Sequence, residues 1–142
     1  MPIHHRAEVT ASLPVDEAFG RLADLGRAPE WNPLCVSLVA DGPVGQGVAV
    51  TYRYRDAGRV REMRGEVTRY EPGAALVLAF RDAQFDLVVG FELASRDGGT
   101  VVTHAFEIAP KGWFSRLMGP VIRAATRRQF ADHLAGLARL LA

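Results

Sequence analysis

A regular alternation of apolar and polar side chains in the middle of the chain restricts its fold most, because a β-strand places every second residue on one face. Between positions 48 and 55 the apolar members are Val48, Val50, Tyr52 and Tyr54. Residues 85–93 and 102–108 alternate in the same way. Turn-forming stretches separate such segments: DGPVGQG at 41, RDAG at 55, YEPG at 70, RDGG at 96 and APKG at 109. This pattern predicts an antiparallel sheet.

The number of strands follows from the same signals. One strand is expected over HHRAEVTA near the start, and further strands begin near 34, 47, 59, 75, 84 and 99, which makes about seven. Apolar residues on one parity and charges on the other predict a sheet with one dry and one wet face. The dry face requires a covering layer.

Two helical regions can supply that layer. The first lies in the segment SLPVDEAFGRLAD. Pro14 suits an opening helical position there, and an apolar stripe is formed by Val15, Ala18, Phe19 and Leu22. The second runs from about Trp113 to the end of the chain, with a kink or restart expected at Gly119 and Pro120. From Pro120 onward it can span roughly 33 Å, enough to cross a whole sheet.

Composition limits the classes of function. The 142 residues are 49% hydrophobic and 23% charged, with a net charge of +1, so we expect a single domain over residues 1–142 with no nucleic-acid partner and no stable membrane insertion. One cysteine, Cys35, excludes an internal disulfide, and we expect a buried inert thiol and a cytoplasmic location. The four histidines have no zinc-binding spacing, and no glycine-rich phosphate loop opens a helix. We therefore expect neither a metal nor a cofactor.

Four segments carry a resemblance to a known family: LPVDEAFGRLADLGRAPEWNP at 13–33, GEVTRYEPGAALVL at 65–78, GGTVVTHAFE at 98–107 and the terminal amphipathic helix. They resemble the START and polyketide cyclase/dehydrase (SRPBCC) superfamily. The resemblance covers nearly the whole chain. It implies an α+β helix-grip fold, with about seven curved antiparallel strands wrapped around a long C-terminal helix and two short helices between strands 1 and 2. The superfamily includes lipid carriers, hormone receptors and aromatic polyketide cyclases, so the resemblance does not choose one function.

The resemblance also interprets the stretch EWNP at 30–33. It implies a second short helix that closes one end of the fold. Trp31 would pack there as a plug, and Pro33 would stop the helix. Asn32 would either cap backbone or face a ligand.

Polar residues of inward parity are the candidates for chemistry, because burying them without partners costs about 1–3 kcal/mol each. The catalytic candidates are Tyr52, Tyr54, Arg69 and His104, and His5 has inward parity on the first strand. Each also has a structural interpretation: the tyrosines as packing, His104 as a hydrogen-bonded core residue, and Arg69 as a solvent-exposed partner of Glu71. The predicted ligand-binding set is Trp31, Asn32, Val50, Tyr52, Tyr54, Met63, Val67, Phe85, Leu87, Val89, Val102, His104, Phe106, Met118 and Ile122.

Arg69 bears on enzymatic activity. The resemblance to aromatic polyketide cyclases implies an arginine inside the pocket, on the strand corresponding to residues 60–70, where it stabilises enolate charge. In the register adopted here Val67 takes that position, and Arg69 is one inward position later. A slip of two residues would bring the arginine to the expected place.

Arginines are concentrated in the terminal helical region, where the only acid is Asp132. They are Arg116, Arg123, Arg127, Arg128 and Arg139. The pattern fits a solvated helix face, and it also fits contact with anionic lipid or an acidic partner.

Three functions remain open at the level of sequence. The first is binding of a small hydrophobic molecule, polyketide-like, isoprenoid or lipid, in a cavity between the sheet and the C-terminal helix. The second is a polyketide cyclase or dehydratase acting on a ligand in that cavity. The third is a protein-interaction module, and a homodimer is one option for the assembly.

Overall fold

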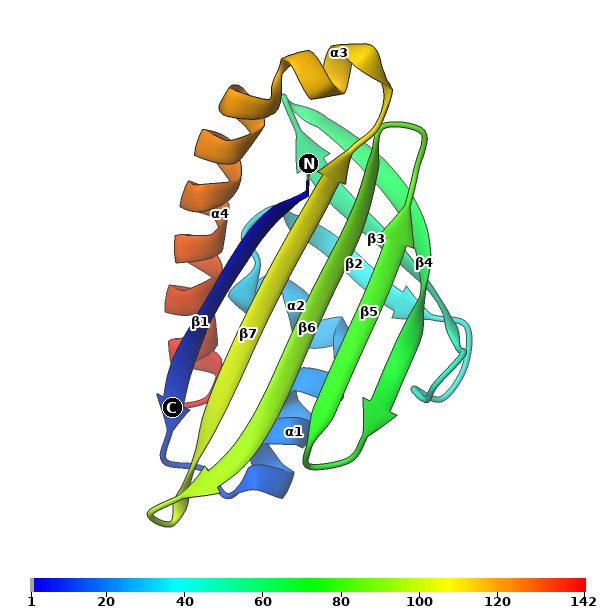
Figure 1. Cartoon of the computed structure of the whole chain (residues 1–142). Coiled ribbons are helices and arrows are strands. Elements are labelled where there is room, and N and C mark those ends of the chain that lie inside the picture. Colours follow the sequence, from blue (N-terminus) through cyan, green and yellow to red (C-terminus); the bar gives the residue numbers. More distant parts are fainter. Residues whose placement is uncertain (1) are drawn as a thin grey trace.

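The computed structural model describes residues 2–142, in which seven antiparallel strands form one sheet in the order β1-β7-β6-β5-β4-β3-β2 (Figure 1). The strands are β1 Ile3–Ala11, β2 Cys35–Ala40, β3 Ala49–Asp56, β4 Arg59–Glu71, β5 Ala75–Arg81, β6 Phe85–Arg96 and β7 Gly99–Pro110. Only β1 and β7 join distant parts of the chain, since every other pair is consecutive. The predicted sheet is confirmed.

The helices are also found where the sequence predicted them. They are α1 Val15–Ala23, the 3-10 turn η1 Leu25–Arg27, α2 Ala28–Trp31, α3 Gly112–Leu117 and α4 Gly119–Leu140. The break between α3 and α4 falls at the predicted Gly119–Pro120 restart. Short helices between β1 and β2 together with a long terminal helix give the predicted helix-grip architecture.

Two hairpins show how local sequence sets the strand register. The two-residue loops Ala57–Gly58 and Asp97–Gly98 have positive φ at both positions. This is the type I′ geometry, whose twist matches that of the flanking strands. Both loops lie in the RDAG and RDGG stretches that predicted turns.

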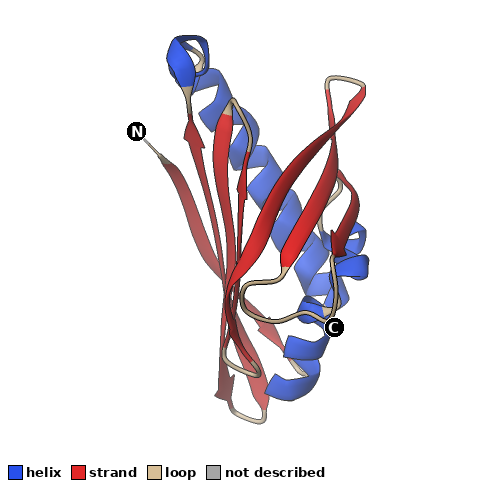
Figure 2. Cartoon of the chain, turned by 90° about the vertical axis from the view of Figure 1, so that its right-hand side faces the viewer, coloured by secondary structure: helices blue, strands red, loops and turns tan. Residues whose placement is uncertain are grey.

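The helices cover different parts of the inner face of the sheet. α4 packs against β1, β7 and α2, whereas η1 and α2 contact β2, and α1 contacts β6 and β7 (Figures 1 and 2). α4 and α2 approach very closely at Gly136, where an added Cβ would lie 2.5 Å from both Cα and O of Trp31. A glycine is therefore required for this helix crossing.

The two halves of α4 differ in burial. In the C-terminal half, Phe130, His133, Leu137 and Leu140 enter the core, whereas Thr126 is the only buried residue between positions 119 and 129. Only the C-terminal half is thus fully packed against the rest of the protein.

Candidate functional site

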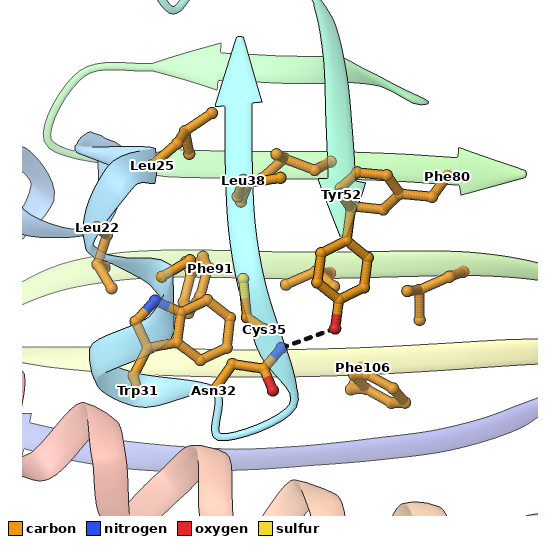
Figure 3. Close-up of a pocket in the computed structure, with 14 residues that line it drawn as sticks. Leu22, Leu25, Trp31, Asn32, Cys35, Leu38, Tyr52, Phe80, Phe91 and Phe106 are labelled. Carbon is orange, nitrogen blue, oxygen red and sulfur yellow. Dashed lines mark hydrogen bonds between the residues drawn. The ribbon is translucent and has the colours of Figure 1, made fainter. Parts of the chain in front are cut away.

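An apolar pocket lies between the α1–α2 segment and the inner face of the sheet (Figure 3). Its lining residues are Leu22, Leu25, Ala28, Trp31, Asn32, Cys35, Leu38, Tyr52, Leu78, Phe80, Leu87, Val89, Phe91 and Phe106. The cavity is small: its volume is about 30 Å³. That is about the volume that one molecule occupies in liquid water.

The only side-chain hydrogen bond between lining residues joins Asn32 to Tyr52. Asn32 follows the last residue of α2, and the following Pro33 favours its extended backbone, with φ −118° and ψ 101°. Its Oδ1 accepts a hydrogen bond from the Leu34 N–H at 3.1 Å, which directs Nδ2 toward the pocket. Nδ2 then donates to the Tyr52 hydroxyl at 3.0 Å.

Tyr52 therefore offers a hydrogen-bond donor. Its oxygen accepts from Asn32, and its own proton finds no acceptor among residues 2–142. Desolvation raises the pKa of Tyr52 above its ordinary value, so the phenol is neutral at physiological pH. A neutral O–H at the wall of an apolar space can donate to a carbonyl oxygen of a ligand.

Cys35 contributes a thiol group to the wall of the pocket. Burial raises the pKa of this thiol to about 11, because the apolar surroundings disfavour the thiolate. The protonated thiol is a poor nucleophile, in keeping with the predicted inert role.

Trp31, Phe91 and Phe106 of the pocket wall also belong to a neighbouring cluster. We call this cluster the histidine box; its members are Trp31, Phe91, His104, Phe106, Phe130 and His133. The His104 ring stacks on Phe91 on one side, with centroids 4.7 Å apart, and on Phe130 on the other, at 5.2 Å. The His133 ring meets Trp31 edge to face at 5.1 Å. Both imidazoles are completely buried.

Hydrogen bonds determine the tautomers in the histidine box. The Nδ1–H of His104 donates to the Gly90 carbonyl at 3.1 Å, so its Nε2 is an acceptor. The Nδ1–H of His133 donates to that Nε2 at 3.2 Å. Desolvation lowers the pKa of both histidines, and both are therefore neutral at pH 7. The described residues contain no group of three or more His, Cys, Asp or Glu side chains suited to a metal.

The structure brings part of the predicted ligand-binding set together. Six of its members line the pocket: Trp31, Asn32, Tyr52, Leu87, Val89 and Phe106. Five others are buried in the core but are not lining residues: Val50, Met63, Val67, Val102 and His104. Tyr54 stacks on Tyr52 from outside the pocket, and Phe85 also lies outside it. His5, half-buried on β1, pairs with Thr126 of α4 at 3.1 Å.

Arg69 does not enter the pocket: its inward parity is wrong, and its interpretation as a solvent-exposed partner of Glu71 is confirmed. The pairing of β4 with β5 shifts register between Val67 and Arg69, so Thr68 forms a bulge. Beyond the bulge the parity of the strand is reversed. Arg69 is exposed and pairs with Glu71, whereas the Tyr70 ring packs on the Phe19 ring with centroids 5.5 Å apart. Alternation alone gave no sign of this extra residue.

The location of the pocket also differs from the prediction. None of its lining residues belongs to α4, and the predicted contacts Met118 and Ile122 are half-buried outside it. The α1–α2 segment takes that place and contributes Leu22, Leu25 and Ala28, which the prediction missed. The missed residues Leu78, Phe80 and Phe91 share the inward parity of their strands and were accessible to the alternation rule.

Comparison with protein families gives a match over residues 2–142 to the family described as polyketide cyclase / dehydrase and lipid transport. The chain belongs to this family. A search of curated protein sequences finds no match. None of the helices in residues 2–142 is long and apolar enough to cross a membrane.

Solved structures resemble this family member in fold. The Zhui aromatase/cyclase from Streptomyces sp. R1128 is 15% identical with a TM-score of 0.78, over 97% of this chain and 92% of that chain. A START superfamily protein from Mycobacterium smegmatis is 13% identical with a TM-score of 0.75, over 99% and 96%. The di-domain ARO/CYC StfQ of the steffimycin biosynthetic pathway is 16% identical with a TM-score of 0.76; the match covers 99% of this chain but only 49% of StfQ.

Proposed function

We propose that this protein binds a small hydrophobic molecule, polyketide-like, isoprenoid or lipid, in the pocket between the α1–α2 segment and the sheet. Family membership indicates a ligand-binding or polyketide cyclase-like role. The observation that supports binding most directly is an apolar lining that holds one polar pair, Asn32 and Tyr52, with a free donor. Apolar walls gain about 25 cal/mol per Å² of ligand surface removed from water, and the pair would orient the ligand.

Binding requires the pocket to widen, because its present volume holds only water-sized molecules. β2 is the part of the pocket wall that can move outward most easily. It is an edge strand of 6 residues that pairs only with β3, and its register shifts between Cys35 and Ser37. It supplies Cys35 and Leu38 to the lining, so a small outward shift of this strand would enlarge the cavity.

Native mass spectrometry of freshly purified protein tests the proposal, with a retained small molecule as the expected result. A Val89→Phe variant narrows the pocket and should lose the bound molecule, whereas Val39→Phe adds the same ring at an exposed site of β2 and should retain it. If hydrophobic compounds neither co-purify nor bind in titrations with an environment-sensitive dye, the binding function is wrong.

A second candidate function, cyclase or dehydratase, is supported by the Tyr52 hydroxyl and by the fold shared with aromatase/cyclases. Tyr52 would polarise a ketone oxygen, while the pocket would hold a flexible poly-β-keto chain in a folded shape. Arg69 has no part in this chemistry, because it lies outside the pocket.

Tyr52→Phe removes only the hydroxyl and should lower turnover of a poly-β-keto substrate by about 10²–10³-fold, as for loss of an oxyanion-hole donor. Tyr54→Phe is the matched control, because that phenol lies outside the lining. The two variants would be compared by the yield of cyclised product in liquid chromatography with mass detection. Equal yields from both would eliminate the catalytic role of Tyr52.

A further inference from the structure

Four large apolar side chains are exposed at one end of the molecule. Trp113 is 78% exposed, Phe114 60%, Leu117 68% and Val121 59%. We call these four residues the tip patch. They belong to α3 and the first turn of α4, and α3 has no buried residue. Clustered exposed apolar groups are costly in water and mark interaction sites.

The position of the tip patch suits contact with an extended surface. Figures 1 and 2 place α3 at an end of the molecule, beyond the end of β7. Trp113 and Phe114 lie against each other there, with ring centroids 5.8 Å apart. The patch is therefore presented away from the sheet and from the pocket walls.

Positive charge surrounds the tip patch. Between Ile108 and Ala131 the chain has no Asp or Glu, while it has Lys111, Arg116, Arg123, Arg127 and Arg128. Lys111 pairs with Asp86 at 3.0 Å. The four arginines are exposed and form no ion pair with side chains of residues 2–142.

The arginines of α4 lie a short way along the helix from the apolar groups. Arg128, the most distant of them, is seven residues from Val121, or roughly 10 Å along the helix axis. At about 100° per residue, Arg128 lies on the same side of α4 as Val121, whereas Arg123 and Arg127 lie roughly on the opposite side. When the tip of the molecule faces a surface, the arginines therefore lie around α4 within about 10 Å of the tip patch along the axis.

We propose that the tip patch and its arginines dock the protein peripherally on an anionic lipid bilayer. The aromatic rings enter the interfacial region, where tryptophan is favoured, and the arginines meet lipid phosphates and anionic headgroups. A second copy of this chain fits the patch less well, because a symmetric contact would bring arginines of like charge together. The docking is independent of the proposed pocket ligand.

The two tryptophans provide a direct test. Trp31 is buried, so Trp113 supplies the solvent-exposed emission. With vesicles of phosphatidylcholine and about 30% phosphatidylglycerol, we expect a blue shift of the emission and co-sedimentation of the protein, both lost at about 1 M salt. Vesicles of phosphatidylcholine alone should give neither, and Trp113→Phe should lose the spectral shift.

Matched variants separate the contributions of charge and of apolar contact. The Arg116→Ala and Arg123→Ala variants should each weaken vesicle binding about fivefold. Alanine at the exposed Arg53 and Arg59, on β3 and β4, should have little effect. Leu117→Ser should likewise weaken binding, in contrast to Val39→Ser on β2.

Three outcomes would overturn the proposal. They are equal binding to neutral and anionic vesicles, an unshifted Trp113 emission on anionic vesicles, and tip-patch variants that change the sedimentation velocity of the free protein without changing vesicle binding. The last result would assign the patch to an interface between copies of this chain. All the substitutions are at exposed positions, and circular dichroism checks that the variants remain folded.

Discussion

The pocket and the histidine box lie next to each other on the inner face of one sheet and share Trp31, Phe91 and Phe106, yet the box is filled and the pocket keeps a cavity of about 30 Å³. The difference lies in the layer above the sheet. Over the box, α4 inserts Phe130 and His133 between the strand side chains. Over the pocket, the α1–α2 segment supplies Leu22, Leu25, Ala28 and Trp31, and a small gap to the sheet remains. The residue types of the sheet therefore do not decide where a cavity forms; the covering elements do.

The polar groups follow this division only in part, because Nε2 of His133 in the box is buried and has no hydrogen-bond partner among residues 2–142. In the box, His104 uses both ring nitrogens in hydrogen bonds with Gly90 and His133. In the pocket, Tyr52 accepts one hydrogen bond and retains a donor. A paired buried group stabilises the fold, whereas an unpaired donor beside free space is available to a ligand.

The largest expected effect on the stability of the protein comes from forcing α4 away from α2 at the histidine box. Gly136→Ala places a methyl group 2.5 Å from the Trp31 backbone, and no side-chain rotation relieves an overlap with backbone atoms. We expect a loss of more than about 4 kcal/mol in the free energy of unfolding, measured by urea denaturation. Gly20→Ala on α1 is the control, because its Cβ meets nothing within 4 Å and it should stabilise the protein by about 1 kcal/mol. Similar stability of the two variants would refute the close crossing.

A pair of leucine truncations compares the filled and hollow regions directly. Leu137→Ala, on α4, removes a completely buried side chain and should cost about 4 kcal/mol, within the usual 2–5 kcal/mol range for buried leucine. Leu38→Ala, at the pocket wall, should cost only about 2 kcal/mol because that side chain already faces free space. Both values come from urea denaturation at the same pH. Equal costs would mean that the pocket is packed as densely as the box.

The pH dependence of stability should originate in the histidine box. Burial lowers the pKa of His104 to about 4 and that of His133 to about 3, so the unfolded chain binds more protons than the native state below pH 6.5. Their contribution to stability is complete above pH 6.5 and is lost as the pH falls toward 4. The loss is about 1.4 kcal/mol per pH unit for each imidazole.

Urea denaturation between pH 4 and pH 7.5 measures this slope. A His104→Phe/His133→Leu double variant removes both titrating groups and should flatten the slope over that interval. Tyr52→Phe, in the pocket, should leave the slope unchanged, because a phenol does not titrate there. A double variant that keeps the full slope would show that other groups carry the pH dependence.

Local patterns predicted most of the architecture correctly. The alternating segments, the RDAG and RDGG turns and the Gly119–Pro120 break were sufficient to predict seven strands and a long terminal helix, because each signal acts over a few residues. Inward parity also placed Tyr52, Leu87 and Val89 on the inner face. The same parity rule failed at Arg69, because one unpaired residue in the β4–β5 ladder reverses every side chain beyond it.

The chain's alternation and turn signals predicted an antiparallel sheet with one apolar face, and its apolar stripes predicted helices to cover that face. They could not assign His104 to a filled cluster and Tyr52 to a cavity, since both have the same inward parity. That assignment depends on where α4 and the α1–α2 segment cross the sheet. The crossing is set by contacts between residues far apart in sequence, such as Gly136 with Trp31, which no local periodicity encodes.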